Sequence, residues 1–217
     1  MCGRFSFAIK ARIIEERFDI EVDERLLFPR YNCAPSQKLA VISNADPGGL
    51  SYYRWGLIPV WAKDSAIGNK MINAKAETIT EKPSFRQPFR KRRCLVPADS
   101  FYEWQKDPLK TPYRIMMLDE SPFAMAGIWD AWINEAGEEI RSFSVLTTMS
   151  NHLVSGIHHR MPVILSRENE KKWLAETDEN LLLEMMGPFE TAPMKAIKIS
   201  HLVNAPVNDR PEIWQAV

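Results

Sequence analysis

The sequence predicts an α+β fold in which a curved, mostly antiparallel β-sheet forms a barrel-like core with a few flanking helices. Short apolar runs rich in valine, isoleucine and aromatic residues outnumber the helical patterns, which is typical of strands. These runs do not alternate regularly with helices, as they would around a parallel sheet. Fifteen prolines are spread along the chain, and the runs lie between them. Strands therefore dominate the predicted architecture.

Six segments carry the strand pattern, because each is short and rich in valine, isoleucine or aromatic side chains. In chain order they are residues 39–43, 51–56, 113–118, 123–129, 142–147 and 162–165.

Three segments show helical patterns instead. Residues 11–18 place three apolar side chains on one face of a helix. A second helix is expected to begin near Ser166, which is a suitable N-cap. A third covers residues 179–186 and stops at Gly187-Pro188.

Length and composition favour one globular domain over residues 1–217, without repeats or flexible linkers. Hydrophobic residues make up 45% of the chain and charged residues 26%, which is ordinary for a globular protein. The 28 basic residues are balanced by 28 acidic ones. This balance argues against a protein that coats nucleic acid through bulk charge, but it leaves room for a local basic groove.

The chain contains no run of about 18 apolar residues and no signal-peptide pattern, so we expect a cytoplasmic protein without a membrane partner. Its three cysteines, Cys2, Cys33 and Cys94, are expected to be reduced thiols. They lie far apart, and no zinc-like Cys or His spacing occurs, so we expect neither a metal nor a cofactor. No heptad or obvious apolar patch indicates more than a monomer.

The first residues, Met1-Cys2-Gly3-Arg4, point to chemistry at the N-terminus. Removal of Met1 is expected because the next residue is small, and Cys2 then carries a free amine and a thiol on adjacent carbons. The amine can form a Schiff base with an aldehyde. The thiol can then close a thiazolidine ring in a favourable intramolecular step. The alternative is an accidental cysteine at a flexible terminus, which Gly3 disfavours because it permits close backbone approach.

Three further segments contain residues suited to a reactive site. Residues 71–78 mix polar with small and apolar side chains, although an edge strand would show the same pattern. Residues 101–104 surround Glu103 with aromatic residues, which would raise its pKa and suit acid or base catalysis, unless Glu103 points outward. His158 and His159 are expected to point to opposite sides of an extended chain, so only one would serve a site.

A basic stretch interleaved with aromatic residues suggests a groove for nucleic acid. Residues 85–93 combine two phenylalanines with arginines and a lysine, and residues 55–61 add two tryptophans. Cations for phosphates and rings for unpaired bases are what a single-strand groove needs. The alternatives are a solvated charged face and tryptophans that belong to the core.

Taken together, these segments resemble the SRAP (SOS-response-associated peptidase) family. The order and spacing of six motifs carry the resemblance, since no motif is specific by itself. They are Met1-Cys2-Gly3-Arg4, Tyr31-Asn32-Cys33-Ala34-Pro35, Trp55-Gly56…Trp61, Ile72-Asn73-Ala74-Lys75…Glu77-Thr78, Phe101-Tyr102-Glu103-Trp104 and Ile157-His158…Arg160-Met161-Pro162. The resemblance implies the SRAP fold and a DNA-associated protein that recognises abasic sites in single-stranded DNA and links covalently to them.

The resemblance also implies the residues of the site. The reactive positions are Cys2, Asn73, Glu103 and His158. The implied DNA contacts are Arg4, Asn32, Pro35, Trp61, Lys75, Thr147 and Arg160. Lys75 stands where relatives often have arginine, which keeps the charge but loses the planar fork. His159 stands where aspartate is common. Neither departure falls on a reactive position.

On this interpretation Cys2 forms a thiazolidine with the C1′ aldehyde of the lesion, and the crosslink shields the lesion from strand cleavage. Glu103 would shuttle protons, Asn73 would orient the terminus and the sugar, and His158 would donate a proton to the opened sugar. Failure of ring closure would allow a weak lyase activity. Two alternatives stay open. One is a cysteine peptidase that uses Cys2 and His158, including self-processing. The other is a single-strand binding module without chemistry.

Overall fold

Two β-sheets form the centre of the fold, and the computed structural model describes residues 2–217. Met1, whose removal is expected, lies outside the described residues. The strands of the first sheet are β1 (Arg4–Phe7), β2 (Arg30–Cys33), β7 (Ser100–Trp104), β8 (Pro112–Met117) and β13 (Met194–Lys198). Their order is β13-β8-β7-β1-β2, and all neighbours are antiparallel.

The second sheet closes on itself. Its strands are β3 (Lys38–Ser43), β4 (Asp46–Trp55), β5 (Asn73–Lys75), β6 (Arg93–Ala98), β9 (Phe123–Ile133), β10 (Glu139–Met149), β11 (Arg160–Pro162) and β12 (Ile164–Leu165). Their order is β11-β10-β4-β3-β6-β9-β12, with β5 beside β10. Because β10 also pairs with β9, the strands β10, β4, β3, β6 and β9 form a closed ring. The pairings of β10 with β4 and β5 are parallel. The predicted α+β fold with a mostly antiparallel, barrel-like core is confirmed.

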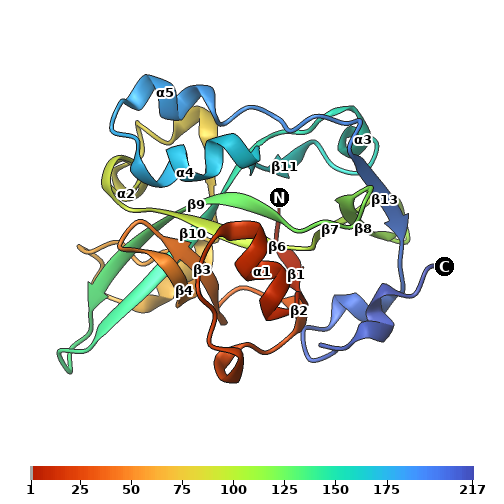
Figure 1. Ribbon diagram of the computed structural model, residues 1–217, viewed down its shortest axis with the longest axis horizontal. Coiled ribbons are helices and arrows are strands. Elements are labelled where there is room, and N and C mark those ends of the chain that lie inside the picture. Colours follow the sequence, from red (N-terminus) through yellow and green to blue (C-terminus); the bar gives the residue numbers. More distant parts are fainter. Residues whose placement is uncertain (1) are drawn as a thin grey trace.

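Helices cover the outside of the sheets. They are α1 (Ala11–Phe18), α2 (Pro83–Lys91), α3 (His152–Ser155), α4 (Arg167–Ala175) and α5 (Glu179–Glu184). In Figure 1, α2, α4 and α5 gather at one end of the closed ring, whereas α3 lies close to β11 and β13. No helix within residues 2–217 combines the length and the apolar character that a membrane crossing requires.

Most predicted elements are confirmed, with two informative differences. The helix over 11–18 has the expected bounds, and Ser166 caps α4 by accepting a hydrogen bond from the backbone N–H of Asn169 at 3.3 Å. The run 162–165 is divided between β11 and β12. Sequence patterns do not reveal α2, because Pro83 begins this helix and Pro88 lies inside it, and prolines usually interrupt helices.

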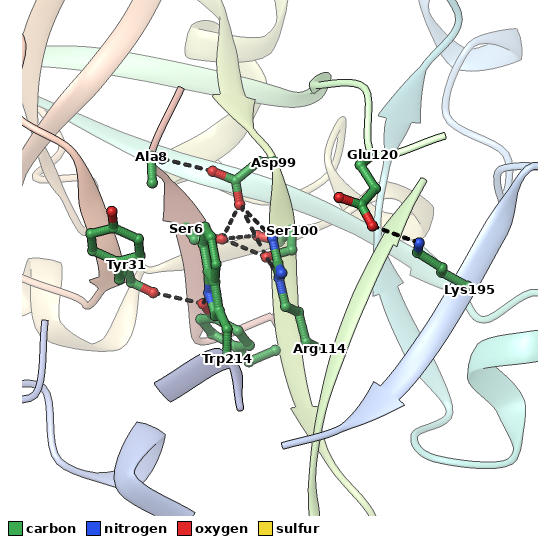
Figure 2. Close-up of polar contacts among 10 residues, drawn as sticks. Ser6, Ala8, Tyr31, Asp99, Ser100, Arg114, Glu120, Lys195 and Trp214 are labelled. Carbon is green, nitrogen blue, oxygen red and sulfur yellow. Dashed lines mark hydrogen bonds and ion pairs between the residues drawn. The ribbon is translucent and has the colours of Figure 1, made fainter. Parts of the chain in front are cut away.

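One continuous stretch of chain connects the two sheets, because β6 and β7 are separated only by Asp99. Asp99 accepts hydrogen bonds from the side-chain hydroxyl of Ser6 and, at 2.6 Å, from the backbone N–H of Ala8. The guanidinium of Arg114 lies 3.5 Å from its carboxylate. Figure 2 shows these side chains converging on Asp99. This junction holds β1 against β7 and so positions the first residues of the chain.

Aromatic side chains anchor β1 to the closed ring. Phe5 of β1 contacts Trp55 of β4, with ring centroids 5.1 Å apart, and Trp55 stacks on Phe143 of β10 at 6.2 Å. All three side chains are buried. Burying rings of this size stabilises a fold by about 2–3 kcal/mol each. The strand that carries the N-terminus is therefore fixed by the core.

Candidate active site

Cys2 lies two residues before the start of β1, and its side chain is fully buried. The side-chain amide of Asn73 donates a hydrogen bond to the carbonyl oxygen of Cys2 at 2.8 Å. Asn73 is the first residue of β5, where it pairs with Val145 of β10. The register of the closed sheet therefore places Asn73 against the N-terminus, far from it in the sequence.

Asn73 also carries an unused hydrogen-bond acceptor. Its side-chain oxygen, Oδ1, is buried and has no hydrogen-bond partner among residues 2–217. Leaving a buried acceptor unsatisfied typically costs about 1–3 kcal/mol, so such atoms call for an explanation. An amine at Cys2 or a hydroxyl of a bound sugar would satisfy this one.

Glu103 and His158 form the second part of the site. Glu103 follows Tyr102 on β7, and Tyr102 pairs with Arg4 of β1, so Glu103 occupies the strand position next to Gly3. The Glu103 side chain is 3% exposed, and its Oε1 lies 4.0 Å from Nδ1 of His158. Burial raises the pKa of Glu103. A carboxyl group whose protonated form is stabilised in this way can both give and accept a proton.

His158 is held in its neutral form. Loss of hydration lowers its pKa to about 4, so the ring is uncharged at neutral pH. Its Nδ1 accepts a hydrogen bond from the backbone N–H of Arg160 at 3.0 Å. Nδ1 also lies 3.2 Å from the carbonyl oxygen of Arg160. Both contacts anchor the ring to the main chain at Arg160.

The thiol of Cys2 is kept protonated. Burial, and then the negative charge of Glu103, raises the pKa of this thiol well above its ordinary value. Cysteine nucleophiles of peptidases need the opposite shift, which a cationic neighbour or a helix N-terminus supplies. The site thus combines a buried thiol with a carboxyl group that suppresses its ionisation.

The expectation that His158 and His159 point to opposite sides is wrong. Their rings stack with centroids 4.4 Å apart and an interplanar angle of 29°. The expectation assumed an extended strand, whereas β11 begins only at Arg160 and the backbone bends at His159. Both rings therefore lie on the same side of the chain, with His158 half-buried and His159 exposed.

Two of the predicted DNA-contact residues hold the C-terminal segment in place. Arg4 donates to the side-chain oxygen of Asn32 at 2.8 Å and to the carbonyl oxygen of Val203 at 2.7 Å. Asn32 is fully buried, and its amide donates to the carbonyl oxygens of Val203, Ala205 and Asn208. In Figure 1 this C-terminal segment lies beside β2. The geometry gives Arg4 and Asn32 a structural role, and contact of either with DNA stays a prediction.

Thr147 and Arg160 are buried, and Arg160 joins them to the exposed side chain of Glu77. Arg160 binds both carboxylate oxygens of Glu77, at 2.6 and 2.9 Å, and the carbonyl oxygen of Thr147 at 2.6 Å. Neither Thr147 nor Arg160 is more than 6% exposed. The backbone N–H of Arg160 binds His158, so this unit also orients the histidine. DNA contacts by Thr147 and Arg160 stay predictions.

The other predicted DNA contacts are accessible. The Trp61 side chain is 56% exposed, Lys75 is exposed and Pro35 is half-buried. A large ring held in water is suited to stacking on an unpaired base, and a lysine is suited to a phosphate. The structure thus leaves these three residues available, and their roles stay predictions.

The basic stretch over residues 85–93 is not a continuous exposed surface. Arg93 is 2% exposed, and its guanidinium binds main-chain carbonyl oxygens of α2 and of α4 and its C-cap. Phe89 is fully buried against Trp173, and Arg92 pairs with Asp130 at 3.1 Å. Several members of the stretch therefore join α2 to the rest of the fold, which favours a structural interpretation of the run.

Two residues at the site were given no role by the sequence, although Glu77 belongs to one of the six motifs. Glu77 fixes Arg160 across 83 positions, and Lys106 lies 3.4 Å from His159 across 53 positions. Both are ordinary charged residues in their local context, and only the fold brings them to the site. Among residues 2–217, no group of three or more His, Cys, Asp or Glu side chains is arranged to hold a metal ion.

Comparisons with known proteins agree with this geometry. The family described as SOS response associated peptidase (SRAP) matches residues 1–206. The chain is 46% identical to the abasic site processing protein YoqW of Bacillus subtilis (strain 168), covering 100% of both proteins. It is 32% identical to the abasic site processing protein HMCES of Xenopus tropicalis, covering 87% of this chain and 66% of that protein.

A solved structure extends the agreement to the fold. The crystal structure of a protein from Bacteroides thetaiotaomicron superposes with a TM-score of 0.89 at 35% identity, over the full length of both chains. The expected resemblance thus holds for sequence and for architecture, and the match reaches from the N-terminal cysteine past β13. On these grounds the chain belongs to the SRAP family.

Proposed function

We propose that this protein recognises abasic sites in single-stranded DNA and forms a covalent crosslink to them through Cys2 once Met1 is removed. The names of its relatives, abasic site processing proteins, support DNA with this lesion as the substrate. The observation that carries the proposal is the position of Cys2. The Asn73 amide donates a hydrogen bond to the carbonyl oxygen of Cys2, and the buried Oδ1 of Asn73 has no hydrogen-bond donor among residues 2–217. Glu103 lies close enough to raise the pKa of the thiol.

The reaction has two bond-forming steps. The free amine of Cys2 attacks the C1′ aldehyde of the opened sugar, and the resulting carbinolamine loses water to give an imine. The thiol sulfur then adds to the imine carbon, and the thiol proton passes to the nitrogen, so that a thiazolidine ring forms. A protonated thiol suits this order because the amine attacks first and the sulfur follows intramolecularly.

The neighbouring residues move and place protons. Glu103 accepts a proton from the attacking amine and returns one to the departing water, a double role that its raised pKa supports. Asn73 accepts a hydrogen bond from the amine or the sugar through Oδ1. His158, which is neutral, donates a hydrogen bond from its ring N–H to the opened sugar. If the ring does not close, the imine permits β-elimination and hence weak lyase activity.

The family name makes a cysteine peptidase the second candidate function. A Cys–His–Asn constellation is a known peptidase arrangement, and Cys2, His158 and Asn73 supply those residue types. The raised pKa of the thiol disfavours this mechanism, because a peptidase nucleophile needs a thiolate. Incubation with unrelated peptides, followed by mass spectrometry, is expected to show no cleavage.

Intact-mass spectrometry after incubation with an abasic oligonucleotide tests the proposal. The expected product lacks Met1 and carries one DNA strand, with loss of one water. Cys2→Ala should bind DNA and form no heat-stable adduct. Cys2→Ser should form an imine that borohydride traps, without a stable product. A stable adduct in Cys2→Ala, or in a protein that keeps a blocking residue before Cys2, would overturn the mechanism.

A denaturing gel separates crosslinking from simple binding. A single-strand binding module without chemistry would give a complex that dissociates in denaturant, whereas a thiazolidine adduct migrates as one covalent species. The expected result is a band of increased mass that persists after heating.

A further inference from the structure

Two loops lead outward from the active site in contact with each other. One loop leaves β7 and contains Gln105 and Lys106, and the other precedes β11 and contains Gly156 and His159. The Gln105 amide donates to the carbonyl oxygen of Gly156 at 3.4 Å, and Nζ of Lys106 lies 3.4 Å from Nδ1 of His159. These contacts hold Lys106 and His159 together at the surface.

The two loops contribute two pairs of side chains, one inside and one outside. Glu103 and His158 form the inner pair, which is largely buried. Lys106 and His159 form the outer pair, and both are exposed. The stacked rings of His158 and His159 connect the pairs. The outer pair therefore lies on the solvent side of the reactive residues.

Positive charge near the outer pair is not balanced by an ion pair. Among residues 2–217, neither Lys106 nor Lys75 has a carboxylate oxygen within 4.0 Å of its ammonium. The nearby carboxylate of Glu77 is already bound by Arg160. The pKa of His159 is lowered, first by loss of hydration and then by the charge of Lys106, with Lys75 contributing. An anion would relieve this accumulation of charge.

We infer that Lys106 and His159, here called the cationic rim, bind a phosphodiester group next to the abasic sugar that reacts with Cys2, in addition to the DNA contact already expected of Lys75. This inference rests on the proposed function. A sugar held at the inner pair places its flanking phosphates outward, where the rim lies. Lys106 supplies charge, and His159 supplies a directed N–H from Nε2, because its Nδ1 accepts from Lys106.

Binding measurements without chemistry test the rim. In a Cys2→Ala background, affinity for a single strand with a tetrahydrofuran abasic analogue is measured by fluorescence anisotropy between about 50 and 200 mM salt. Lys106→Ala should weaken binding about threefold to tenfold at low salt and reduce the slope of log K against log salt by about 0.7. His159→Asp should weaken binding at least as much, because the new carboxylate competes for Lys106.

A matched control comes from the same turn. Lys110 is exposed and lies four positions after Lys106, without a contact to His159. Lys110→Ala removes the same charge and is expected to weaken binding less than twofold. Equal losses for Lys106→Ala and Lys110→Ala would mean that only overall charge matters, and would overturn the rim as a site.

A chemical substitution in the DNA identifies the group that is bound. Neutral methylphosphonates replace the linkage on the 5′ or the 3′ side of the abasic analogue, one at a time. At one of the two positions, the methylphosphonate should lower the affinity of the protein that keeps Lys106. At the same position it should not lower the affinity of the Lys106→Ala variant. If the effects of the methylphosphonate and of Lys106→Ala on affinity are additive at both positions, a contact between the rim and a flanking phosphate is refuted.

Crosslinking kinetics separate the rim from the reaction itself. With active Cys2, Lys106→Ala should raise the DNA concentration needed for half-maximal rate and leave the rate at saturation unchanged. A lowered saturating rate with unchanged half-saturation would overturn the inference. Crosslinking that fails in the parent protein would instead refute the proposed function, even if the rim still binds the phosphate.

Discussion

Two buried polar clusters flank β1 and β7, and they differ in how completely their hydrogen bonds are made. The junction cluster consists of Ser6, Asp99, Ser100 and Arg114, and Figure 2 shows its side chains bound to one another. No buried side-chain polar atom of these four residues lacks a partner. The active-site cluster consists of Cys2, Asn73, Glu103 and His158. It contains an unsatisfied buried oxygen on Asn73 and three groups with shifted pKa values.

The difference separates a structural role from a chemical one. A saturated polar cluster stabilises one arrangement of the backbone and has no capacity left for a ligand. A cluster with an unused acceptor and displaced pKa values stores unfavourable free energy that a substrate can relieve. Variants of the junction cluster should therefore change stability, and variants of the active-site cluster should change rate.

The largest effect is expected from Asp99→Ala. This change leaves Arg114, Ser6 and the backbone N–H of Ala8 without their buried acceptor. Removing one partner of a buried charged network typically lowers stability by about 3–5 kcal/mol. Denaturant unfolding measures the loss, and crosslinking per folded molecule should fall by less than in Glu103→Gln, because the junction acts on Cys2 only through the position of β1.

Two further variants serve as a fallback and as a control for this test. If Asp99→Ala does not fold, Ser6→Ala should give a smaller loss of about 1 kcal/mol by the same mechanism. Glu16→Ala removes an exposed carboxylate paired with Arg12 and should change stability by less than about 0.5 kcal/mol. A neutral effect of both Asp99→Ala and Ser6→Ala would contradict the structural role of the junction.

Glu103→Gln should slow crosslinking about a hundredfold, because a general acid or base typically contributes at least this factor. Stability should stay equal or rise, since burial disfavours the ionised carboxylate that glutamine replaces. Rates at saturating DNA, together with unfolding curves, provide the measurement. A clear loss of stability with an unchanged rate would place Glu103 with the junction cluster instead.

Asn73→Ala should slow crosslinking about tenfold by releasing the main chain of Cys2. The lost hydrogen bond should lower stability by about 1 kcal/mol at most, and removal of the unsatisfied Oδ1 offsets part of this loss. Asn180→Ala, an exposed asparagine on α5, serves as the matched control and should change neither quantity. An unchanged rate in Asn73→Ala would mean that Cys2 does not depend on this contact.

The smallest effect is a pH dependence of stability from His158. Its pKa is about 4 in the folded protein and near its ordinary value when unfolded, so the unfolded chain binds more protons between these values. This contribution to stability is present above the ordinary pKa and is lost as pH falls toward 4. The loss should be about 1 kcal/mol or less, because water reaches part of the ring.

The groups around His158 are Glu103, His159, Lys106 and Arg160, and the His158→Asn variant keeps all of them. Unfolding of the parent and of His158→Asn is followed from pH 7 to pH 4. The stability difference between them should shift steadily in favour of the variant. A difference that is constant with pH would show that His158 titrates normally.

Local sequence patterns determined the class of elements and the kind of chemistry. Runs such as residues 123–129 are strands because β-branched and aromatic side chains suit a pleated, buried backbone, and β9 follows from them. The pairing of an amine and a thiol at Cys2 depends only on covalent structure, so it needs no fold to be foreseen. Six short motifs in order were sufficient to indicate the SRAP family, which the comparisons confirm.

Only the tertiary structure decided which residues meet. Asn73 reaches Cys2 through the pairing of β5 with β10, and Glu103 reaches the same terminus through the register of β1 on β7. The bend before β11 turned His159 toward His158, against the rule for an extended chain. Such contacts depend on strand register and on burial by distant parts of the chain. A local pattern contains no information on either, because the same residues could face water or the core until the sheets close.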